Sequence, residues 1–272
     1  MNNRIDATFS ELARERRAGF IAYITAGDPR PALTVPLVLE IEKRGADFIE
    51  LGVPFSDPLA DGVVNQRAAE RALAHGMNLE KVLGIVTKIR KRSEVPIIIF
   101  TYLNPVLNYG FRRFARDASR AGVDGILSLD LPPEEAARYE AELSRRGVRS
   151  IFIIAPTTPA ERMKLIARHA RGFIYYVSRT GVTGVRAHLS GELARRVRLI
   201  RRLTGIPIAV GFGISTAAHV TAVARIADAV VVGSALVKEI ELHGARADLV
   251  ERVGEKVRQL TAPLRRSCGG RR

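Results

Sequence analysis

The chain has 272 residues, of which 47% are hydrophobic and 26% are charged. Its one cysteine, Cys268, lies in a Gly- and Arg-rich tail, which excludes an internal disulfide and a cysteine-based metal cluster. This cysteine usage favours a reducing, cytoplasmic compartment. No apolar run approaches the roughly 18 residues that a membrane-spanning helix needs, so we expect neither membrane insertion nor export. The net charge of +15 comes from scattered arginines without interleaved aromatic residues, so we expect no specific nucleic-acid binding.

The first predicted element is a charged amphipathic helix within residues 1–19. Eight short apolar, β-branched runs follow, each preceded by a helical stretch. They begin near positions 20, 48, 96, 126, 151, 173, 207 and 229. The interval from 48 to 96 is much wider than the others, which indicates an insertion after the second strand.

The apolar runs are continuous rather than alternating, as in VPIIIF (95–100), which predicts strands covered on both faces in a parallel sheet. Eight strand-helix units predict an α/β fold, a (β/α)8 TIM barrel with an extra N-terminal helix. A doubly wound open sheet is the competing fold, but YITAGDPRP (23–31) matches the dinucleotide-binding turn of that fold poorly. We expect one domain over residues 1–264 and a basic, disordered tail over 265–272.

The arginine-rich segment GELARRVRLIRRLTG (191–205) predicts a helix with a solvated basic face. Its apolar residues Leu193, Val197 and Ile200 recur at helical spacing. The arginines occupy the remaining faces: Arg195, Arg196, Arg198, Arg201 and Arg202. We therefore interpret this charge as a solvated helix surface.

Polar residues at the carboxyl ends of the strands are the candidates for chemistry, because barrel active sites are built there. Glu50 lies among apolar neighbours in FIELGV, where burial would raise its pKa towards that of a general acid or base. A structural ion pair is the alternative, yet no Lys or Arg follows at a nearby strand end before Arg179. Asp57 and Asp61 follow in turn-forming sequence, and Asp61 belongs to a loop long enough to fold over the barrel mouth.

Three glycine clusters predict a phosphate site near strands seven and eight. They are RTGVTG (179–184), GFG (211–213) and Gly233 with Ser234. Glycine lets backbone N–H groups approach an anion, and Ser234 is expected to cap a helix that begins at Ala235.

The lysines and histidines lie outside the strand ends, so neither a Schiff-base lysine nor a histidine metal cluster is expected. We expect no metal and no cofactor in this chain. The chemistry therefore falls to carboxylates and tyrosines.

The strings FIAYITAGDP, ELGVPFSDPLADG, YYVSRTGVTG, GFGIS and VVGSALV closely resemble the tryptophan synthase alpha subunit family, in register from Phe9 to Lys238. The resemblance implies retro-aldol cleavage of indole-3-glycerol phosphate to indole and glyceraldehyde 3-phosphate in tryptophan biosynthesis, without a cofactor in this chain.

By resemblance, three residues are catalytic. Glu50 corresponds to the acid/base that moves protons at indole C3 and the adjacent hydroxyl, and Asp61 to the carboxylate that binds the indole N–H. Tyr175 corresponds to the tyrosine near Glu50.

The resemblance also implies substrate-binding positions. Tyr23, Phe100 and Leu127 are expected to wall the indole pocket. The expected phosphate positions are Gly184, Gly211, Gly213, Gly233 and Ser234, and Thr183 corresponds to a loop that closes towards Asp61.

Members of this family pair with a beta subunit that carries pyridoxal phosphate, typically as an alpha2-beta2 heterotetramer. Pro54, Asp57, Asn104 and Pro132 correspond to positions that face this partner. Val63, Val64 and Asn65 depart from the family pattern, which usually has proline and then apolar residues there. Two alternatives stay open: a free-standing indole-glycerol-phosphate lyase, and a sugar-phosphate isomerase on the same barrel.

Overall fold

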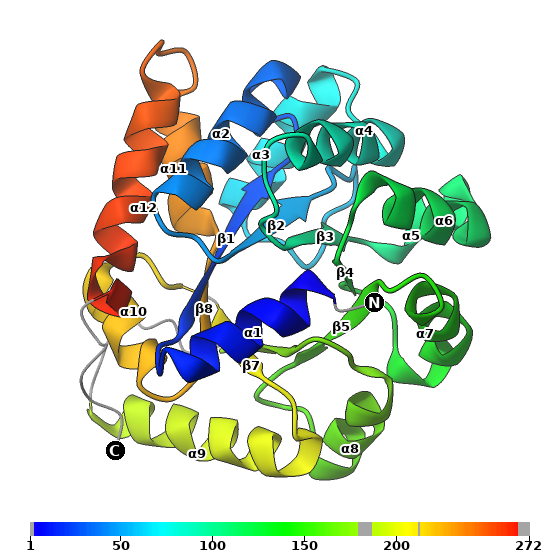
Figure 1. Ribbon diagram of the computed structural model, residues 1–272, viewed down its shortest axis with the longest axis vertical. Coiled ribbons are helices and arrows are strands. Elements are labelled where there is room, and N and C mark those ends of the chain that lie inside the picture. The colour runs from blue at the N-terminus through cyan, green and yellow to red at the C-terminus, as the bar shows by residue number, and fades with distance from the viewer. Residues whose placement is uncertain (1–2, 179–186, 212, 266–272) are drawn as a thin grey trace.

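The computed structural model describes residues 3–178, 187–211 and 213–265, and its strands form a closed parallel barrel (Figure 1). The strands pair in chain order, and β8 pairs with β1. Their bounds are β1 Gly19–Thr25, β2 Phe48–Gly52, β3 Ile97–Thr101, β4 Gly125–Ser128, β5 Arg149–Ile154, β6 Ile174–Val177, β7 Ile208–Gly211 and β8 Ala229–Val232. The predicted (β/α)8 barrel is confirmed, and the open sheet is excluded.

Helices surround the barrel and connect successive strands (Figure 1). Their bounds are α1 Arg4–Arg14, α2 Pro31–Lys43, α3 Val63–Ala74, α4 Leu79–Arg90, α5 Leu103–Tyr109, α6 Phe111–Ala121, η1 Pro133–Glu135, α7 Ala136–Ser144, α8 Ala160–His169, α9 Ala187–Thr204, α10 Ala217–Ala224, α11 Ser234–His243 and α12 Leu249–Arg265. The wide interval between β2 and β3 holds both α3 and α4, which confirms the predicted insertion.

The strands are apolar throughout because both of their faces are buried, as parallel barrels require. Outward-facing residues pack against the surrounding helices in the main hydrophobic cluster. Inward-facing residues fill the barrel in a second cluster that includes Ile21, Ile98 and Ala209. All seven residues of β1 and all five of β2 are buried.

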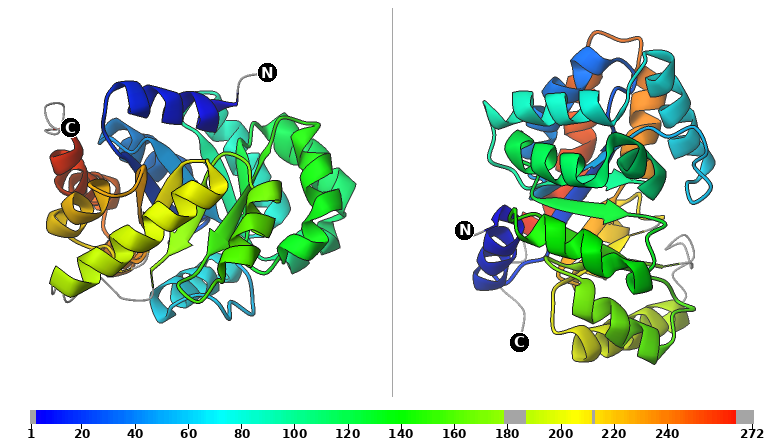
Figure 2. Two further views of the ribbon diagram at one scale, coloured as in Figure 1. Left: turned by 90° about the horizontal axis from the view of Figure 1, so that it is seen from below. Right: turned by 90° about the vertical axis from the view of Figure 1, so that its right-hand side faces the viewer.

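Helix α1 closes the amino-terminal end of the barrel. Its buried residues Ile5, Phe9 and Leu12 belong to the inner cluster. The Phe9 ring lies 4.7 Å from the ring of Phe48 and 5.6 Å from that of Phe173, measured between centroids. Figure 2 shows α1 at one end of the barrel and the segment leading into α3 at the opposite end. Within the described residues, the end opposite α1 is therefore the end at which a ligand could enter.

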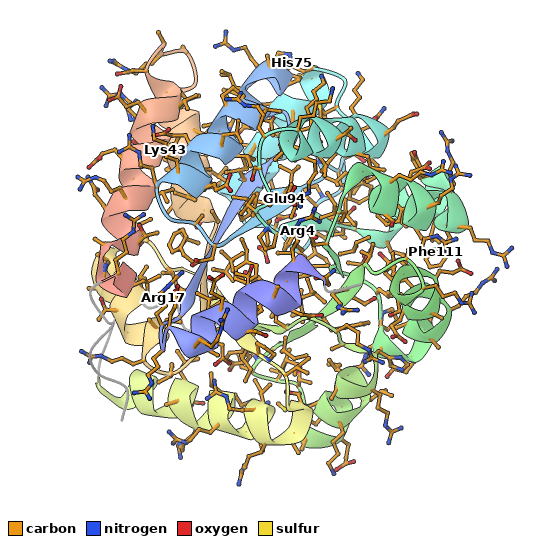
Figure 3. The ribbon with its side chains drawn as sticks, in the orientation of Figure 1. Arg4, Arg17, Lys43, His75, Glu94 and Phe111 are labelled. Atoms are coloured by element: carbon orange, nitrogen blue, oxygen red, sulfur yellow. The ribbon has the colours of Figure 1, made fainter. Side chains whose placement is uncertain are left out.

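Three aspartates, each just before a strand, connect neighbouring strands at the amino-terminal end of the barrel. The carboxylates of Asp47, Asp124 and Asp228 accept hydrogen bonds from the backbone N–H groups of Phe20, Ile97 and Ile208 at 2.7, 2.8 and 2.9 Å. Each also pairs with arginine: Arg17 with Asp47, Arg4 and Arg90 with Asp124, and Arg201 with Asp228. Arg4 further reaches the exposed Glu94 at 2.5 Å, beside α1 (Figure 3).

The basic face of α9 agrees with its prediction in most respects. Val197 and Ile200 are fully buried, and Arg195, Arg198, Arg201 and Arg202 are exposed. Arg196 is the exception, so its predicted place on the solvated face is wrong. It is partly buried and donates hydrogen bonds to the carbonyls of Pro156 and Thr158 at 2.7 and 2.5 Å, because the loop between β5 and α8 presents both carbonyls to α9.

Among the described residues, no helix is long and apolar enough to span a membrane. Helix α12 ends at Arg265, and the remainder of the predicted tail, residues 266–272, lies outside the described residues. The division into one domain and a tail stays a prediction.

Candidate active site

A cavity of about 350 Å³ opens at the carboxyl ends of the strands. Its walls come from strand ends and from the first turns of α3 and α11. The lining residues are Tyr23, Glu50, Gly62, Val63, Val64, Asn65, Phe100, Tyr175, Gly213, Ile214, Val231, Gly233 and Ser234. The barrel thus brings together residues that are far apart in the chain, at the end where barrel enzymes carry their chemistry.

Glu50 lies in the middle of β2 and points into this cavity. Its neighbour in β1 is Tyr23 and its neighbour in β3 is Ile98. The side chain is fully buried, and neither carboxyl oxygen has a hydrogen-bond partner among the described residues. Burial raises the pKa of Glu50 to about 8, because desolvation penalises the charged form. A group with this pKa can both give and take a proton near neutral pH.

Two tyrosines flank Glu50, each lying over a glycine of the next strand. The Tyr23 hydroxyl lies 2.5 Å from the position that a Cβ at Gly52 would take, and the Tyr175 hydroxyl lies 2.3 Å from that of a Cβ at Gly211. Burial and the nearby carboxylates raise the pKa of both tyrosines, so both hydroxyls stay protonated. Gly211 therefore makes room for Tyr175, and it does not itself line the cavity.

Asp61 lies on the loop between β2 and α3, just before the cavity-lining Gly62. One of its carboxylate oxygens accepts a hydrogen bond from the Tyr102 hydroxyl at 2.9 Å, and the other accepts one from the Asn65 amide at 3.4 Å. Burial raises the pKa of Asp61, and these two hydrogen bonds oppose the shift. The Tyr102 hydroxyl also accepts the backbone N–H of Ala60 at 2.9 Å, which anchors the loop to the end of β3.

Ring contacts complete the apolar wall. The rings of Tyr23 and Phe100 meet edge to face with centroids 5.1 Å apart. Val64, Ala68 and Val237 belong to the same small cluster. Leu127 lies deeper in the barrel interior, beside Phe100 in the strand register, and does not line the cavity.

Glycines and a helix start form another wall. Gly213 has a φ of 71°, a left-handed conformation that favours glycine. Helix α11 begins at Ser234, with Gly233 as its N-cap and no side-chain cap. The prediction that Ser234 caps a helix starting at Ala235 is wrong by one residue, because the Gly233 carbonyl already accepts the N–H groups of Leu236 and Val237. Thr183 and Gly184 lie outside the described residues.

The four residues expected at a partner interface differ in exposure. Asp57 and Asn104 are exposed, Pro132 is partly exposed and Pro54 is buried. Two exposed leucines accompany them: Leu59, 93% exposed, follows Asp57, and Leu107, 55% exposed, lies one helical turn after Asn104. Apolar exposure of this kind marks an interaction surface when it is contiguous.

The sequence reasoning missed three residues of this site. Tyr102 directly follows the apolar run that begins near position 96, Gly52 lies in the run that begins near position 48, and the sequence patterns assigned a role to neither. Asn65 was noted only as a departure from a pattern, although the polar residue itself, one turn into a predicted helix after Asp61, was the available signal. Within the described ranges, no group of three His, Cys, Asp or Glu side chains could hold a metal ion.

The end closed by α1 and the cavity at the carboxyl ends of the strands define an α/β barrel of the kind that binds a small ligand at this end. Comparison with known proteins gives the family. A model of the family described as "Tryptophan synthase alpha chain" matches residues 9–265.

Relatives with this name cover nearly the whole chain. The protein of Solibacter usitatus is 49% identical, over 98% of this chain and 99% of its own length, and that of Geobacter sulfurreducens is 48% identical over the same shares. The crystal structure of tryptophan synthase subunit alpha from Legionella pneumophila superposes with a TM-score of 0.90 at 42% identity, covering 97% of this chain and 99% of that chain.

The chain therefore belongs to the tryptophan synthase alpha chain family. Its reaction is the cleavage of indole-3-glycerol phosphate to indole and D-glyceraldehyde 3-phosphate in tryptophan biosynthesis, a carbon–carbon lyase reaction. Membership of this family excludes the alternative of a sugar-phosphate isomerase.

Proposed function

We propose that Glu50 moves the protons of this cleavage and that Asp61 stabilises the charge that develops on the indole ring. The observation that carries the proposal is the Glu50 carboxyl group, which is buried in a ligand-sized cavity and has no hydrogen-bond partner among the described residues. A buried carboxyl without an ion pair costs folding free energy, so its retention fits a chemical rather than a structural role.

The protonation state of Glu50 suits the first step. With a pKa of about 8, its carboxyl group is mostly protonated at neutral pH. It gives this proton to C3 of the indole ring, which leaves a positive charge shared with the ring nitrogen. The resulting carboxylate then takes the proton of the adjacent side-chain hydroxyl. The oxygen electron pair forms the aldehyde, the carbon–carbon bond breaks, and its electrons restore the aromatic ring.

Asp61 acts on the ring nitrogen in this proposal. Its carboxylate accepts the indole N–H and so stabilises the positive charge of the protonated ring. The hydrogen bonds from Tyr102 and Asn65 favour its ionised form. In this arrangement, Tyr23, Phe100 and Tyr175 hold the ring against Glu50. Leu127, the neighbour of Phe100 in the strand register, supports the Phe100 ring.

The substrate phosphate is proposed to bind at the opposite wall. Gly213, Gly233 and Ser234 line the cavity there, and the first N–H groups of α11 carry the positive end of the helix dipole. Gly184 is proposed to add a backbone donor, and Thr183 is proposed to close over Asp61. Gly211 supports this wall indirectly by admitting the Tyr175 ring.

A tryptophan synthase beta subunit is the proposed partner, in an alpha2-beta2 assembly with pyridoxal phosphate on the beta subunit. A neighbouring structure is a "tryptophan synthase complex" from Pyrococcus furiosus, with a TM-score of 0.82 and 38% identity, covering 90% of this chain and 98% of that chain. Exposed Leu59 and Leu107, beside Asp57 and Asn104, suit an apolar interface. Pro54 and Pro132 would stiffen the loops that dock, and the assembly is proposed to be cytoplasmic.

Indole release from indole-3-glycerol phosphate tests this proposal, with the isolated chain and with an added beta subunit. We expect slow release alone and strong activation by the partner. A rate that the partner leaves unchanged would favour the free-standing lyase. Asp61→Asn should lose most turnover while glycerol phosphate still binds; a near-normal rate would remove the role of Asp61.

A further inference from the structure

Asn65 is a polar residue in the cavity, and the proposed mechanism does not use its amide oxygen. It belongs to the first turn of α3 and lines the cavity together with Glu50, Tyr23 and Phe100. Its Nδ2 donates to the Asp61 carboxylate at 3.4 Å. Its Oδ1 is buried, and among the residues that the structure describes it has no hydrogen-bond partner.

The orientation of this amide follows from its neighbour. A carboxylate has no proton to donate, so the NH2 group must face Asp61, and the amide oxygen must face away from it. Rotating the amide by 180° would set two acceptors against each other. Leaving a buried acceptor without a partner is unfavourable, so we expect a partner to arrive with the ligand.

The bound substrate offers such a partner. Indole-3-glycerol phosphate carries a ring N–H and hydroxyl groups on its glycerol chain, and each of these is a hydrogen-bond donor. Val64, the residue before Asn65, packs against Tyr23 and Phe100, the proposed ring pocket, so the start of α3 lies against the space that the substrate would fill.

On the basis of the proposed function, we propose that Asn65 is a substrate-binding residue that also positions Asp61. Its Oδ1 accepts a hydrogen bond from a hydroxyl of the glycerol chain, because the ring N–H is bound by Asp61, and its Nδ2 holds the Asp61 carboxylate. A site built around such an acceptor discriminates against analogues that lack the donor. The favourable effect of the Asn65 bond on ionised Asp61 supports the second part.

The test is Asn65→Leu, which keeps the approximate size of the side chain and removes both polar groups. Loss of the substrate hydrogen bond should raise KM for indole-3-glycerol phosphate about threefold to tenfold. Loss of the bond to Asp61 raises the pKa of that carboxyl, so the acidic limb of the kcat/KM profile should move to higher pH. An unchanged KM, or an acidic limb that stays in place, overturns the proposal.

Indole-3-propanol phosphate identifies the donor, because it keeps the ring N–H and the phosphate and lacks the chain hydroxyls next to the ring. Because Oδ1 accepts a chain hydroxyl, inhibition of Asn65→Leu by this analogue should stay at the wild-type level. If Asn65→Leu weakens inhibition by the analogue as much as it raises KM, the lost contact is not to a chain hydroxyl, and the proposal is overturned.

Gln66→Leu is the matched control. The Gln66 side chain donates to the backbone carbonyl of Asp61 at 2.9 Å, and it does not line the cavity. Gln66→Leu should leave KM and the acidic limb of the kcat/KM profile unchanged. If both variants shift these quantities, the shift reflects a displaced loop, and the proposal is overturned. Glu50→Gln separates the two hypotheses. If this variant keeps wild-type turnover, the proposed function fails. If it loses turnover while Asn65→Leu keeps the wild-type KM and acidic limb, only the inference about Asn65 fails.

Discussion

Buried carboxyl groups at the two ends of the barrel differ in their hydrogen-bond and ion-pair partners. At the amino-terminal end, Asp47, Asp124 and Asp228 each accept a backbone N–H of a neighbouring strand and pair with arginine. At the carboxyl-terminal end, Glu50 is fully buried and has no partner in the described residues. Side chains of one chemical class thus stabilise the fold at one end and are available for proton transfer at the other.

The partners of a buried carboxyl group affect its pKa. Burial raises the pKa of Asp124, but the charge of Arg90 and the hydrogen bonds from Ile97 and Arg4 oppose this shift, whereas burial of Glu50 is not opposed in this way. A carboxyl deprived of partners is held neutral by desolvation, and a bound substrate can then receive its proton. The comparison predicts that changes at the two ends separate stability from activity.

The largest effect is expected for Glu50→Gln. Removing a general acid/base should lower kcat by two to four orders of magnitude, about 3–5 kcal/mol in the barrier. The free energy of unfolding should not fall, because the amide introduces no buried charge. Steady-state kinetics with denaturant unfolding measures both quantities. A stability loss as large as the kinetic effect would mean that Glu50 is structural.

The pH dependence of stability should also single out Glu50. Its folded-state pKa, about 8, lies above the ordinary value of 4.5, so the folded protein binds more protons than the unfolded chain between these values. The contribution of Glu50 is present below pH 4.5 and is lost as the pH rises towards 8. Relative to Glu50→Gln, wild-type unfolding free energy should therefore decline across this window. A constant difference would contradict the raised pKa.

At the other end, Asp124→Ala should lower the free energy of unfolding by about 3 kcal/mol, because it removes the carboxylate that pairs with the partly buried Arg90 and that accepts the N–H of Ile97. Turnover per folded molecule should stay at the wild-type level, since the change lies at the closed end of the barrel. Urea unfolding and active-site titration test the separation. A selective loss of kcat would break the comparison.

Gly211→Ala should destabilise the protein by about 1–3 kcal/mol, because its Cβ would lie 2.3 Å from the Tyr175 hydroxyl. Adding Tyr175→Phe removes that oxygen and should restore part of the loss in a double-mutant cycle. Gly84→Ala is the control: a Cβ there meets nothing within 4 Å, so thermal unfolding should show no loss of stability. Additive effects at 211 and 175 would contradict the steric explanation.

The smallest effect is expected for Glu94→Ala. Its side chain is 76% exposed, and its ion pair with Arg4 is screened by water (Figure 3). The free energy of unfolding should change by no more than about 0.5 kcal/mol. A larger loss in urea unfolding would show that α1 depends on this pair rather than on Phe9 and its neighbours.

Much of the architecture was predictable from local patterns. The apolar runs located the strands because a strand buried on both faces cannot alternate, and the wide interval predicted the insertion that holds α3 and α4. Helix α1 was predicted from its amphipathic pattern, but its position across the barrel end was not. That position depends on contacts of Phe9 with Phe48 and Phe173, which are remote in the chain.

Two errors have the same physical origin. Arg196 was placed on a solvated face, yet it binds two carbonyls that follow β5. Ser234 was expected to cap α11, yet the helix starts at Ser234 itself. Helical periodicity reports which face is apolar, but it does not report where the next element presents a carbonyl group.

The sequence by itself determined the barrel, the family resemblance and the candidacy of Glu50 and Asp61, because these depend on residue types and their spacing along the chain. Only the tertiary structure decided which carboxylates have partners. It pairs Asp124 with Arg4 and Arg90, leaves Glu50 without a hydrogen-bond partner in the described part of the chain, and turns Asn65 towards Asp61. Protonation and hydrogen bonding depend on neighbours in space, and closure of the barrel sets those neighbours.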